Sequence, residues 1–226
     1  MNDDTPKPYD DDHDGMDVSD LRRSITGGKL ERADLLDDPV DQFERWFRQA
    51  CDAIKLDPNA MCLATVDARG QPSSRTVLLK YFDHGGYVFF TNLSSKKAVD
   101  IAQNPRVSLL FFWPELARQI RIDGKAQAIP TRETLKYFMT RPRGSQIGAW
   151  VSAQSSIIHS RSLLEAKFDE LKRKFGDGEV PLPSFWGGYR VVADEYEFWQ
   201  GRSNRLHDRF RYTPGEEAWQ IERLCP

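Results

Sequence analysis

The stretch that decides the fold is MCLATVDARGQPSSRTVLLKYFDHGGYVFFTN, residues 61–92. Three runs in it are rich in β-branched and aromatic residues, and they are separated by Arg69-Gly70 and by Asp-His-Gly-Gly at residues 83–86. Runs of this composition between glycine-containing turns are typical of β-strands, and such short connections favour antiparallel neighbours. We therefore predict strands over residues 61–66, 72–82 and 87–92.

The same pattern continues toward the C-terminus, where further strands are predicted over residues 106–113, 119–129, 189–192, 196–200, 205–212 and 218–224. Apolar residues at helical spacing predict helices over residues 38–54, 96–103, 132–140 and 160–175. The first helix opens at Asp38-Pro39, with Asp38 as its N-cap and Pro39 in its first turn. Many short strands with helices between them predict an α+β fold, mainly β, built on an antiparallel barrel with flanking helices.

Residues 1–20 contrast with the rest of the chain. They hold eight Asp and almost no large apolar side chains. Such a segment cannot bury enough apolar surface to offset the entropy lost on ordering. We predict a disordered acidic tail over residues 1–20 and a single domain over residues 21–226.

Composition and charge narrow the classes of function. The formal net charge is −2, so no overall positive field exists to hold nucleic acid or an anionic membrane. The longest apolar run, near residues 107–113, is too short to span a bilayer, and the N-terminus lacks the features of a signal peptide. Cys51, Cys62 and Cys225 are widely spaced, without a Cys-x-x-Cys pair. We expect a cytoplasmic protein with no disulfide framework and no metal, and with Cys51 and Cys62 as small core residues.

Cationic side chains embedded in apolar sequence are the candidate functional residues. Lys96 and Lys97 fall in the first turn of a predicted helix, where the helix dipole disfavours cations. A bound phosphate would resolve that conflict, because free N–H groups and the dipole both attract anions there. A plain surface is an equal alternative for these two residues. The segment Arg-Thr-Val-Leu-Leu-Lys at residues 75–80 carries a cation at each end, which by itself also fits a solvated strand.

Tyr137 and Arg141 form a second group with Ser145. The first two are four residues apart on one helix face, and Pro142 ends that helix, so Ser145 is expected in the following loop. Tyr, Arg and Ser together suit a phosphate, although an exposed helix end is the alternative.

The third group is Arg205, His207 and Arg209, which an extended strand would point to one face. Two guanidiniums beside an imidazole repel one another and disfavour its protonation unless an anion lies among them. This favours a functional site over surface decoration. The sequence has no pattern typical of zinc hydrolases, Walker or Rossmann nucleotide-binding proteins, or common serine hydrolases.

Several of these residues lie within longer strings that resemble the pyridoxine 5'-phosphate oxidase family, also called the pyridoxamine 5'-phosphate oxidase family. The matching strings run through residues 75–80, 89–92, 104–107, 141–150, 181–188 and 197–209. The likeness covers residues 20 to 226, and several long strings in one order are far more specific than one short motif.

The resemblance implies an FMN-binding split barrel and a homodimer with FMN at the subunit interface. It implies oxidation of pyridoxine 5'-phosphate or pyridoxamine 5'-phosphate to pyridoxal 5'-phosphate in vitamin B6 metabolism, with oxygen as electron acceptor and hydrogen peroxide as product. The implied FMN-binding residues are Arg75, Thr76, Val77, Leu78, Leu79, Lys80, Phe90, Thr91, Lys96, Lys97, Gln119, Gln154, Ser155, Trp199 and Arg209.

The resemblance also implies substrate contacts. The substrate phosphate would be bound by Lys80, Tyr137, Arg141 and Ser145. Arg205 and His207 would lie against the pyridine ring as catalytic residues, and Arg22 would belong to a mobile arm over the substrate.

Three positions depart from the family pattern. Ile25 stands where the arm commonly has Tyr, Lys96 where Arg is frequent, and Ala153 where Lys is common. In addition, Arg75 and Lys80 fall on opposite faces of an ideal strand, so both can meet one ligand only if the strand bends or bulges.

Two other functions compete with the oxidase. Split barrels of this kind also carry flavin or deazaflavin reductases of other substrates, but those would not need the Tyr137, Arg141 and Ser145 group. A pyridoxal-phosphate carrier would keep the fold without catalysis, but it would not need the residues implied for FMN.

Overall fold

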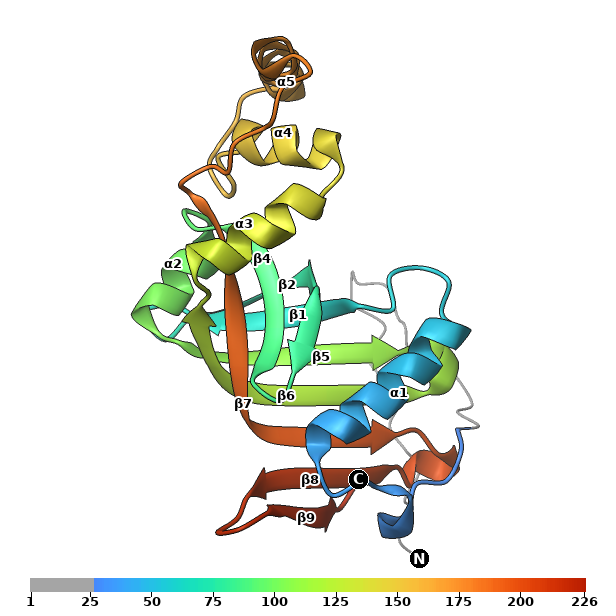
Figure 1. The fold of residues 1–226 in the computed structure, drawn as a ribbon. Helices are drawn as coiled ribbons and strands as arrows, with labels where there is room; N and C mark the ends of the chain where they lie inside the picture. The colour runs from blue at the N-terminus through green and yellow to red at the C-terminus, as the bar shows by residue number, and fades with distance from the viewer. Residues whose placement is uncertain (1–26) are drawn as a thin grey trace, which may run out of the picture.

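The structure is a computed structural model that describes residues 27–226; the predicted tail over residues 1–20, Arg22 and Ile25 lie outside the described residues. Its centre is a nine-stranded antiparallel sheet that curls on itself (Figure 1). The strands are β1 Ala60–Val66, β2 Pro72–Leu78, β3 Tyr81–Asp83, β4 Gly86–Asn92, β5 Arg106–Trp113, β6 Arg118–Ala128, β7 Trp186–Gln200, β8 Asp208–Pro214 and β9 Trp219–Leu224. The main path is β2-β1-β5-β6-β7-β4-β3, with β8 paired to β7 and β9 to β8. The predicted α+β fold, mainly β and antiparallel, is confirmed.

The long strand β7 explains how the sheet curls. Its first part, residues 186–191, pairs with β4, and its last part, residues 196–200, pairs with β8, while β6 follows its other edge. The register with β6 shifts between Asp123 and Gly124, as at a β-bulge. A Cβ at Gly124 would lie 2.2 Å from the carbonyl oxygen of Val192, so only glycine permits this close approach.

The helices lie at the two ends of the sheet (Figure 1). They are α1 Pro39–Ala53, α2 Lys96–Gln103, α3 Thr131–Thr140, α4 Arg143–Val151 and α5 Arg161–Phe175, with 3-10 turns η1 Arg32–Asp34, η2 Pro114–Leu116 and η3 Ser203–Arg205. Helix α1 lies near β8 and β9, whereas α3, α4 and α5 rise from the opposite end. Asp38 caps α1 as predicted, since its side chain accepts the N–H of Val40 at 2.7 Å.

Two hydrophobic clusters hold these layers together. In the larger one, between α1 and the sheet, the Phe43 ring meets Phe82 and Tyr87 edge-on, with centroids 4.8 and 4.9 Å apart. The smaller cluster joins α3, α4 and α5 to the start of β7 and includes Phe138 and Trp186. It fixes α3 and α4 beside β4, and these helices carry Tyr137 and Ser145.

Two strand predictions have the wrong bounds. The predicted strand over residues 72–82 is two strands, because the chain leaves the β1 ladder after Leu78 and the N–H of Lys80 then donates to the carbonyl of Val88. This break supplies the bend that Arg75 and Lys80 require. The predicted strands over residues 189–192 and 196–200 are one strand, β7, because pairing with β6 continues across the polar residues between them.

Two predictions about site residues are also wrong. The strand predicted over residues 205–212 is β8, which begins only at Asp208, and Arg205 lies in η3 with a φ of 60°, so Arg205 and His207 do not line up with Arg209 along one strand face. Ser145 lies in the first turn of α4 and not in a loop, because a second helix begins directly after Pro142.

Cys51 is exposed, which corrects its prediction as a core residue. The buried face of α1 runs through Phe43, Trp46 and Ala50, and Cys51 is rotated about 100° beyond Ala50. Cys62 is half-buried in β1. Among residues 27–226, no helix combines the length and the apolar character that crossing a membrane requires.

Candidate active site

Two adjoining cavities lie where β2, β4, α2, α3 and α4 meet. One, of about 580 Å³, is lined by Lys80, Tyr137, Arg141 and Ser145 among others, and we call it the arginine cavity. The other, of about 630 Å³, is lined by Arg75, Lys96, Lys97 and Ser155 among others, and we call it the lysine cavity. They share a wall formed by Leu78, Lys80, Phe90, Thr91 and Gln154.

Arg75 is fixed at the lysine cavity by neutral acceptors and by one buried acid. Its guanidinium donates to Thr65 Oγ1 at 2.8 Å and to Ser73 Oγ at 2.6 Å. Asp100 of α2, only 2% exposed, accepts from Thr65 Oγ1 at 2.8 Å and from Lys96 Nζ at 3.0 Å. Burial raises the pKa of Asp100, but its hydrogen bonds from Thr65 and Lys96 outweigh burial and the pKa is lowered. This carboxylate therefore orients the cations around it.

Lys97 has a different environment. Its side chain is buried, and Nζ donates to Gln154 Oε1 at 2.8 Å, Thr91 Oγ1 at 3.1 Å and Ser95 Oγ at 3.3 Å. Within residues 27–226 no carboxylate pairs with this ammonium. Burial lowers the pKa of Lys97, and the charge of Arg75 lowers it further. A buried cation with neutral partners at a helix N-terminus is unfavourable unless an anion joins it.

The lysine cavity therefore fits a phosphate group. It is lined by the four cations Arg75, Lys80, Lys96 and Lys97, and the buried carboxylate of Asp100 behind it pairs with Arg75 and Lys96. Free N–H groups and the dipole at the start of α2 add to the attraction for an anion. The structure brings together here the predicted residues Arg75, Thr76, Val77, Leu78, Lys80, Phe90, Thr91, Lys96, Lys97, Gln154 and Ser155.

The arginine cavity has its own cation. The Nη1 atom of Arg141 is buried and has no hydrogen-bond partner among the described residues. Burial lowers the pKa of Arg141, and nearby Tyr137 opposes that shift. The guanidinium carbon lies 4.7 Å from the ring centroid of Trp186, so it is held by stacking. With Lys80, Tyr137 and Ser145 on the same wall, this cavity can accept a second anion.

The remaining predicted residues form a separate group on β6, β7 and β8. Gln119 is opposite Trp199, which is opposite Arg209, so the three make one row across the sheet. The His207 ring lies 4.6 Å from that of Trp199, and its Nδ1 accepts the N–H of Arg202 at 3.0 Å. Within the described chain this row, with Arg205 and His207, lines neither cavity.

Leu79 directly follows β2 and, unlike the residues at the end of that strand, does not line either cavity. Its side chain is 4% exposed and belongs to the large hydrophobic cluster, so it lines neither cavity. Asp100 and Trp186 also belong to the site but were not among the residues predicted from the sequence. The signal for Asp100 was present, since an acid four residues after Lys96 can pair with it on one helix face. Trp186 lies in one of the matching strings, over residues 181–188, but nothing in its local sequence indicates a contact with Arg141.

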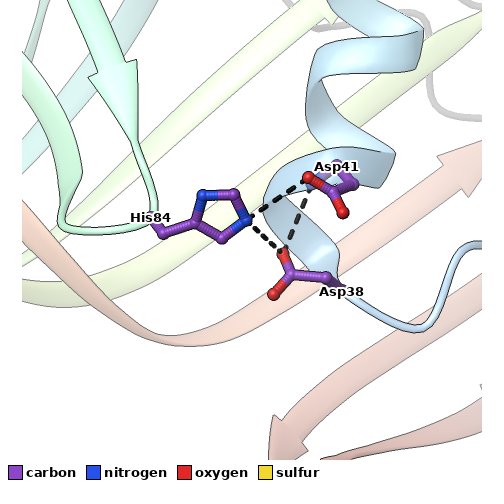
Figure 2. Close-up of side chains that lie close together, drawn as sticks. All are labelled: Asp38, Asp41 and His84. Carbon is purple, nitrogen blue, oxygen red and sulfur yellow. Dashed lines mark hydrogen bonds and ion pairs between the residues drawn. The ribbon is translucent and has the colours of Figure 1, made fainter.

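Figure 2 shows a group of Asp38, Asp41 and His84 whose ligand atoms lie within 4.8 Å of one another. The His84 Nε2 atom is 3.3 Å from Asp41 Oδ1 and 3.8 Å from Asp38 Oδ1. Asp38 Oδ1 already accepts the N–H of Val40 at the start of α1, where the dipole disfavours a cation. We therefore interpret the group as a helix cap with a surface histidine.

Family models match most of the chain. The model described as pyridoxamine 5'-phosphate oxidase matches residues 47–175, and the model described as pyridoxine 5'-phosphate oxidase C-terminal dimerisation region matches residues 186–226. A pyridoxine/pyridoxamine 5'-phosphate oxidase of Rippkaea orientalis is 60% identical over 93% of this chain and 100% of its own. One of Yersinia enterocolitica is 58% identical over 95% of this chain and 99% of its own.

Solved structures agree on the architecture. PhzG from Burkholderia lata, in complex with tetrahydrophenazine-1-carboxylic acid, is 30% identical with a TM-score of 0.83, covering 89% of this chain and 100% of its own. An FMN-binding protein of Nostoc punctiforme, related to pyridoxamine 5'-phosphate oxidase, has a TM-score of 0.69 at 15% identity, covering 85% of this chain and 100% of its own, and shows the fold alone. By its sequence and its fold, this chain belongs to the pyridoxamine 5'-phosphate oxidase family.

Proposed function

We propose that this chain is an FMN-dependent oxidase that converts pyridoxine 5'-phosphate or pyridoxamine 5'-phosphate to pyridoxal 5'-phosphate, with oxygen as electron acceptor. One observation carries the proposal: two adjoining cavities each hold cations that the surrounding acids do not neutralise. A reaction between two phosphorylated molecules, FMN and substrate, accounts for both. Relatives about 60% identical over nearly the full length carry this activity in their names.

The lysine cavity would hold FMN. Arg75, Lys96 and Lys97 would bind the FMN phosphate, and the residues from Thr76 to Leu78 would contact one edge of the FMN molecule. FMN, when bound, accepts two electrons from the substrate and passes them to oxygen. The chain supplies binding, orientation and the exclusion of water.

The arginine cavity would hold the substrate phosphate. Arg141 offers a guanidinium fork, Lys80 a point charge, and Tyr137 and Ser145 neutral donors. Because Lys80 lines both cavities, a substrate bound here lies next to the cofactor. Fixing the phosphate would hold the pyridine ring in one place relative to the cofactor.

We infer that the partner subunit supplies the second group of residues. The matched dimerisation region covers residues 186–226, which include Trp199, Arg205, His207 and Arg209. A homodimer could place this group of one subunit against the cavities of the other, so that each FMN lies at the interface.

His207 and Arg205 would then act on the substrate. Because His207 Nδ1 accepts the Arg202 N–H, a neutral imidazole carries its proton on Nε2 and can donate it to a substrate oxygen or ring atom. Arg205 would stabilise negative charge and exclude water. We also propose a cytoplasmic location, which fits three cysteines that are all free.

The test starts from the purified protein and its visible spectrum. Pyridoxine 5'-phosphate is added without oxygen, and air is then admitted. We expect flavin absorbance that is lost on adding substrate and returns with air, alongside pyridoxal 5'-phosphate. A flavin that does not respond would contradict the substrate, and protein that binds no added FMN would contradict the cofactor.

PhzG shows that a similar fold can hold a different molecule, so another substrate of the same flavin is the second candidate. The Arg141 cavity favours the phosphorylated substrate. A flavin that responds to unphosphorylated aromatic substrates as well as to pyridoxine 5'-phosphate would favour the alternative.

A further inference from the structure

Trp186 is the first residue of β7 and lines the arginine cavity with 9% of its surface exposed. Its ring stacks on Phe90, with centroids 5.2 Å and planes 4° apart, and Phe90 stacks on Tyr137 at 4.1 Å and 14°. We call Phe90, Tyr137 and Trp186 the aromatic platform. The guanidinium carbon of Arg141 lies over the Trp186 ring of this platform, 4.7 Å from the ring centroid.

A glycine in β7, Gly188, leaves room for the Phe90 ring of the platform. A Cβ at Gly188 would lie 2.8 Å from a ring carbon of Phe90 and 3.0 Å from the carbonyl oxygen of Phe89. A larger residue there would displace Phe90 from its contacts with Tyr137 and Trp186, whose own ring centroids are 6.2 Å apart. The platform therefore depends on a close approach between β4 and β7 that glycine permits.

Cation–π contacts hold the guanidinium of Arg141, with the Trp186 ring at 4.7 Å and the Phe138 ring farther away at 5.8 Å. Its buried Nη1 has no hydrogen-bond partner, and no ion pair to Arg141 exists among residues 27–226. A guanidinium held over an aromatic face by such contacts keeps its N–H donors available for an anion. Trp186 thus fixes the orientation of Arg141 without using its donors.

We propose that Trp186 is a positioning residue that sets the preference for a phosphorylated substrate, acting through Arg141. This rests on the proposed function, since it assigns the arginine cavity to the substrate phosphate. The Trp186 indole favours one orientation of the Arg141 guanidinium, so the N–H donors of Arg141 are already in place when a phosphate binds. An unphosphorylated alcohol gains nothing from that orientation.

The test compares Trp186→Leu with Trp186→Phe, which keeps a ring beneath Arg141. In the FMN-loaded enzyme, kcat and KM are measured for pyridoxine 5'-phosphate and for pyridoxine. We expect Trp186→Leu to raise KM for the phosphorylated substrate about tenfold, with little change in kcat, because a cation–π contact of this kind is lost. The kcat/KM for pyridoxine should fall much less than that for pyridoxine 5'-phosphate, and Trp186→Phe should recover most of the loss.

Trp150→Leu is the matched control. Trp150 packs against the same small cluster, with its ring 5.9 Å from that of Phe175, but it does not line the arginine cavity. This variant should lose stability without changing the preference. An unchanged KM in Trp186→Leu, an equal fall in kcat/KM for both substrates, or the same shift in Trp150→Leu would overturn the proposal.

Binding of inorganic phosphate separates this proposal from the proposed function. Calorimetry on protein saturated with FMN should show weaker phosphate binding in Trp186→Leu than in wild type. If the wild type oxidises neither substrate but this difference remains, the oxidase function fails and the role of Trp186 stands. Equal phosphate binding in both proteins would overturn the role of Trp186, whatever the activity.

Discussion

The backbone N–H of Leu30 donates a hydrogen bond of 3.1 Å to Oδ2 of Asp208, although 178 residues separate the two in the chain. The same carboxylate accepts from Arg223 at 2.7 Å and from Arg202 at 3.3 Å. Asp208 directly follows His207, so this acid ties the start of the described chain to the loop that carries a proposed catalytic residue.

Asp208→Asn should lower the free energy of unfolding by about 2 kcal/mol at neutral pH, because the Leu30 N–H and two guanidiniums lose a charged acceptor. Urea unfolding measures this change. Asp194→Asn is the control: Asp194 pairs with Arg106 on the surface, and removing such a pair should change stability by less than about 1 kcal/mol. A similar loss in both variants would contradict the special role of Asp208.

The effect of Asp208 should depend on pH. Burial raises the pKa of Asp208, but the hydrogen bonds from Leu30 and Arg223 outweigh burial, and the pKa is lowered. A lowered folded-state pKa contributes stability above the pKa of the unfolded chain, about 3.9, and that contribution is lost as pH falls through the folded-state value. The difference between wild type and Asp208→Asn should therefore shrink in unfolding curves below about pH 4.

Lys97→Met should change stability and cofactor binding in opposite directions. Removing a buried ammonium that has only neutral partners should raise the stability of the FMN-free protein. The loss of a phosphate ligand should weaken FMN binding about tenfold or more. Thermal unfolding and quenching of flavin fluorescence measure the two effects. If FMN binds Lys97→Met as tightly as wild type, Lys97 does not bind the phosphate.

Arg141→Lys should raise KM for pyridoxine 5'-phosphate by about tenfold or more, because an ammonium cannot reproduce the guanidinium fork and stacks less well on Trp186. Steady-state kinetics with the FMN-loaded enzyme measure this. Arg143→Lys is the control, since Arg143 donates to the carbonyl oxygen of Gly178 at 2.7 Å and does not line the cavity. Equal effects of the two substitutions would contradict a specific role for Arg141.

A shared site predicts recovery of activity in mixed dimers. Arg141→Gln and Arg205→Leu should each be nearly inactive, but a mixed dimer would contain one site with both native residues. Random mixing should restore about a quarter of wild-type activity, since half of the dimers are mixed and one of their two sites is intact. Mixing Arg141→Gln with Lys97→Met should give no activity beyond the average of the two parent variants, because both residues line the cavities of one chain. No recovery in the first mixture would place the site within a single subunit.

Local patterns predicted most elements because they are determined over a few residues. Alternation and turn residues located β4, β5 and β6, and Asp38 marked the start of α1. Errors arose where a distant partner decides the backbone. The pairing of β6 carries β7 through its polar middle, and packing against the small cluster lets a second helix begin after Pro142.

The candidate site was predictable in part. The strings that carry Arg75, Lys80 and Arg141 were recognised from sequence, and Lys96 and Lys97 were singled out at a predicted helix start. The structure gathers these residues at two adjoining cavities. Arg205, His207 and Arg209 were expected on one strand face. The positive φ of Arg205 in η3 prevents this. Asn204 directly before it, also at positive φ, is a residue type typical of such turns, whereas an arginine at positive φ is not signalled by its own type.

By itself, the sequence determined most of the segments that form strands and helices, the Asp38 cap of α1, and which family the chain resembles, since these depend on short-range propensity and on the order of motifs. Only the tertiary structure decided that Asp100 holds Arg75 beside Lys96, that Lys97 meets neutral partners, and that Trp186 lies beneath Arg141. The reason is that burial and sheet register set the distances between segments remote in the chain, and those distances determine which charges are neutralised and which stay available for a ligand.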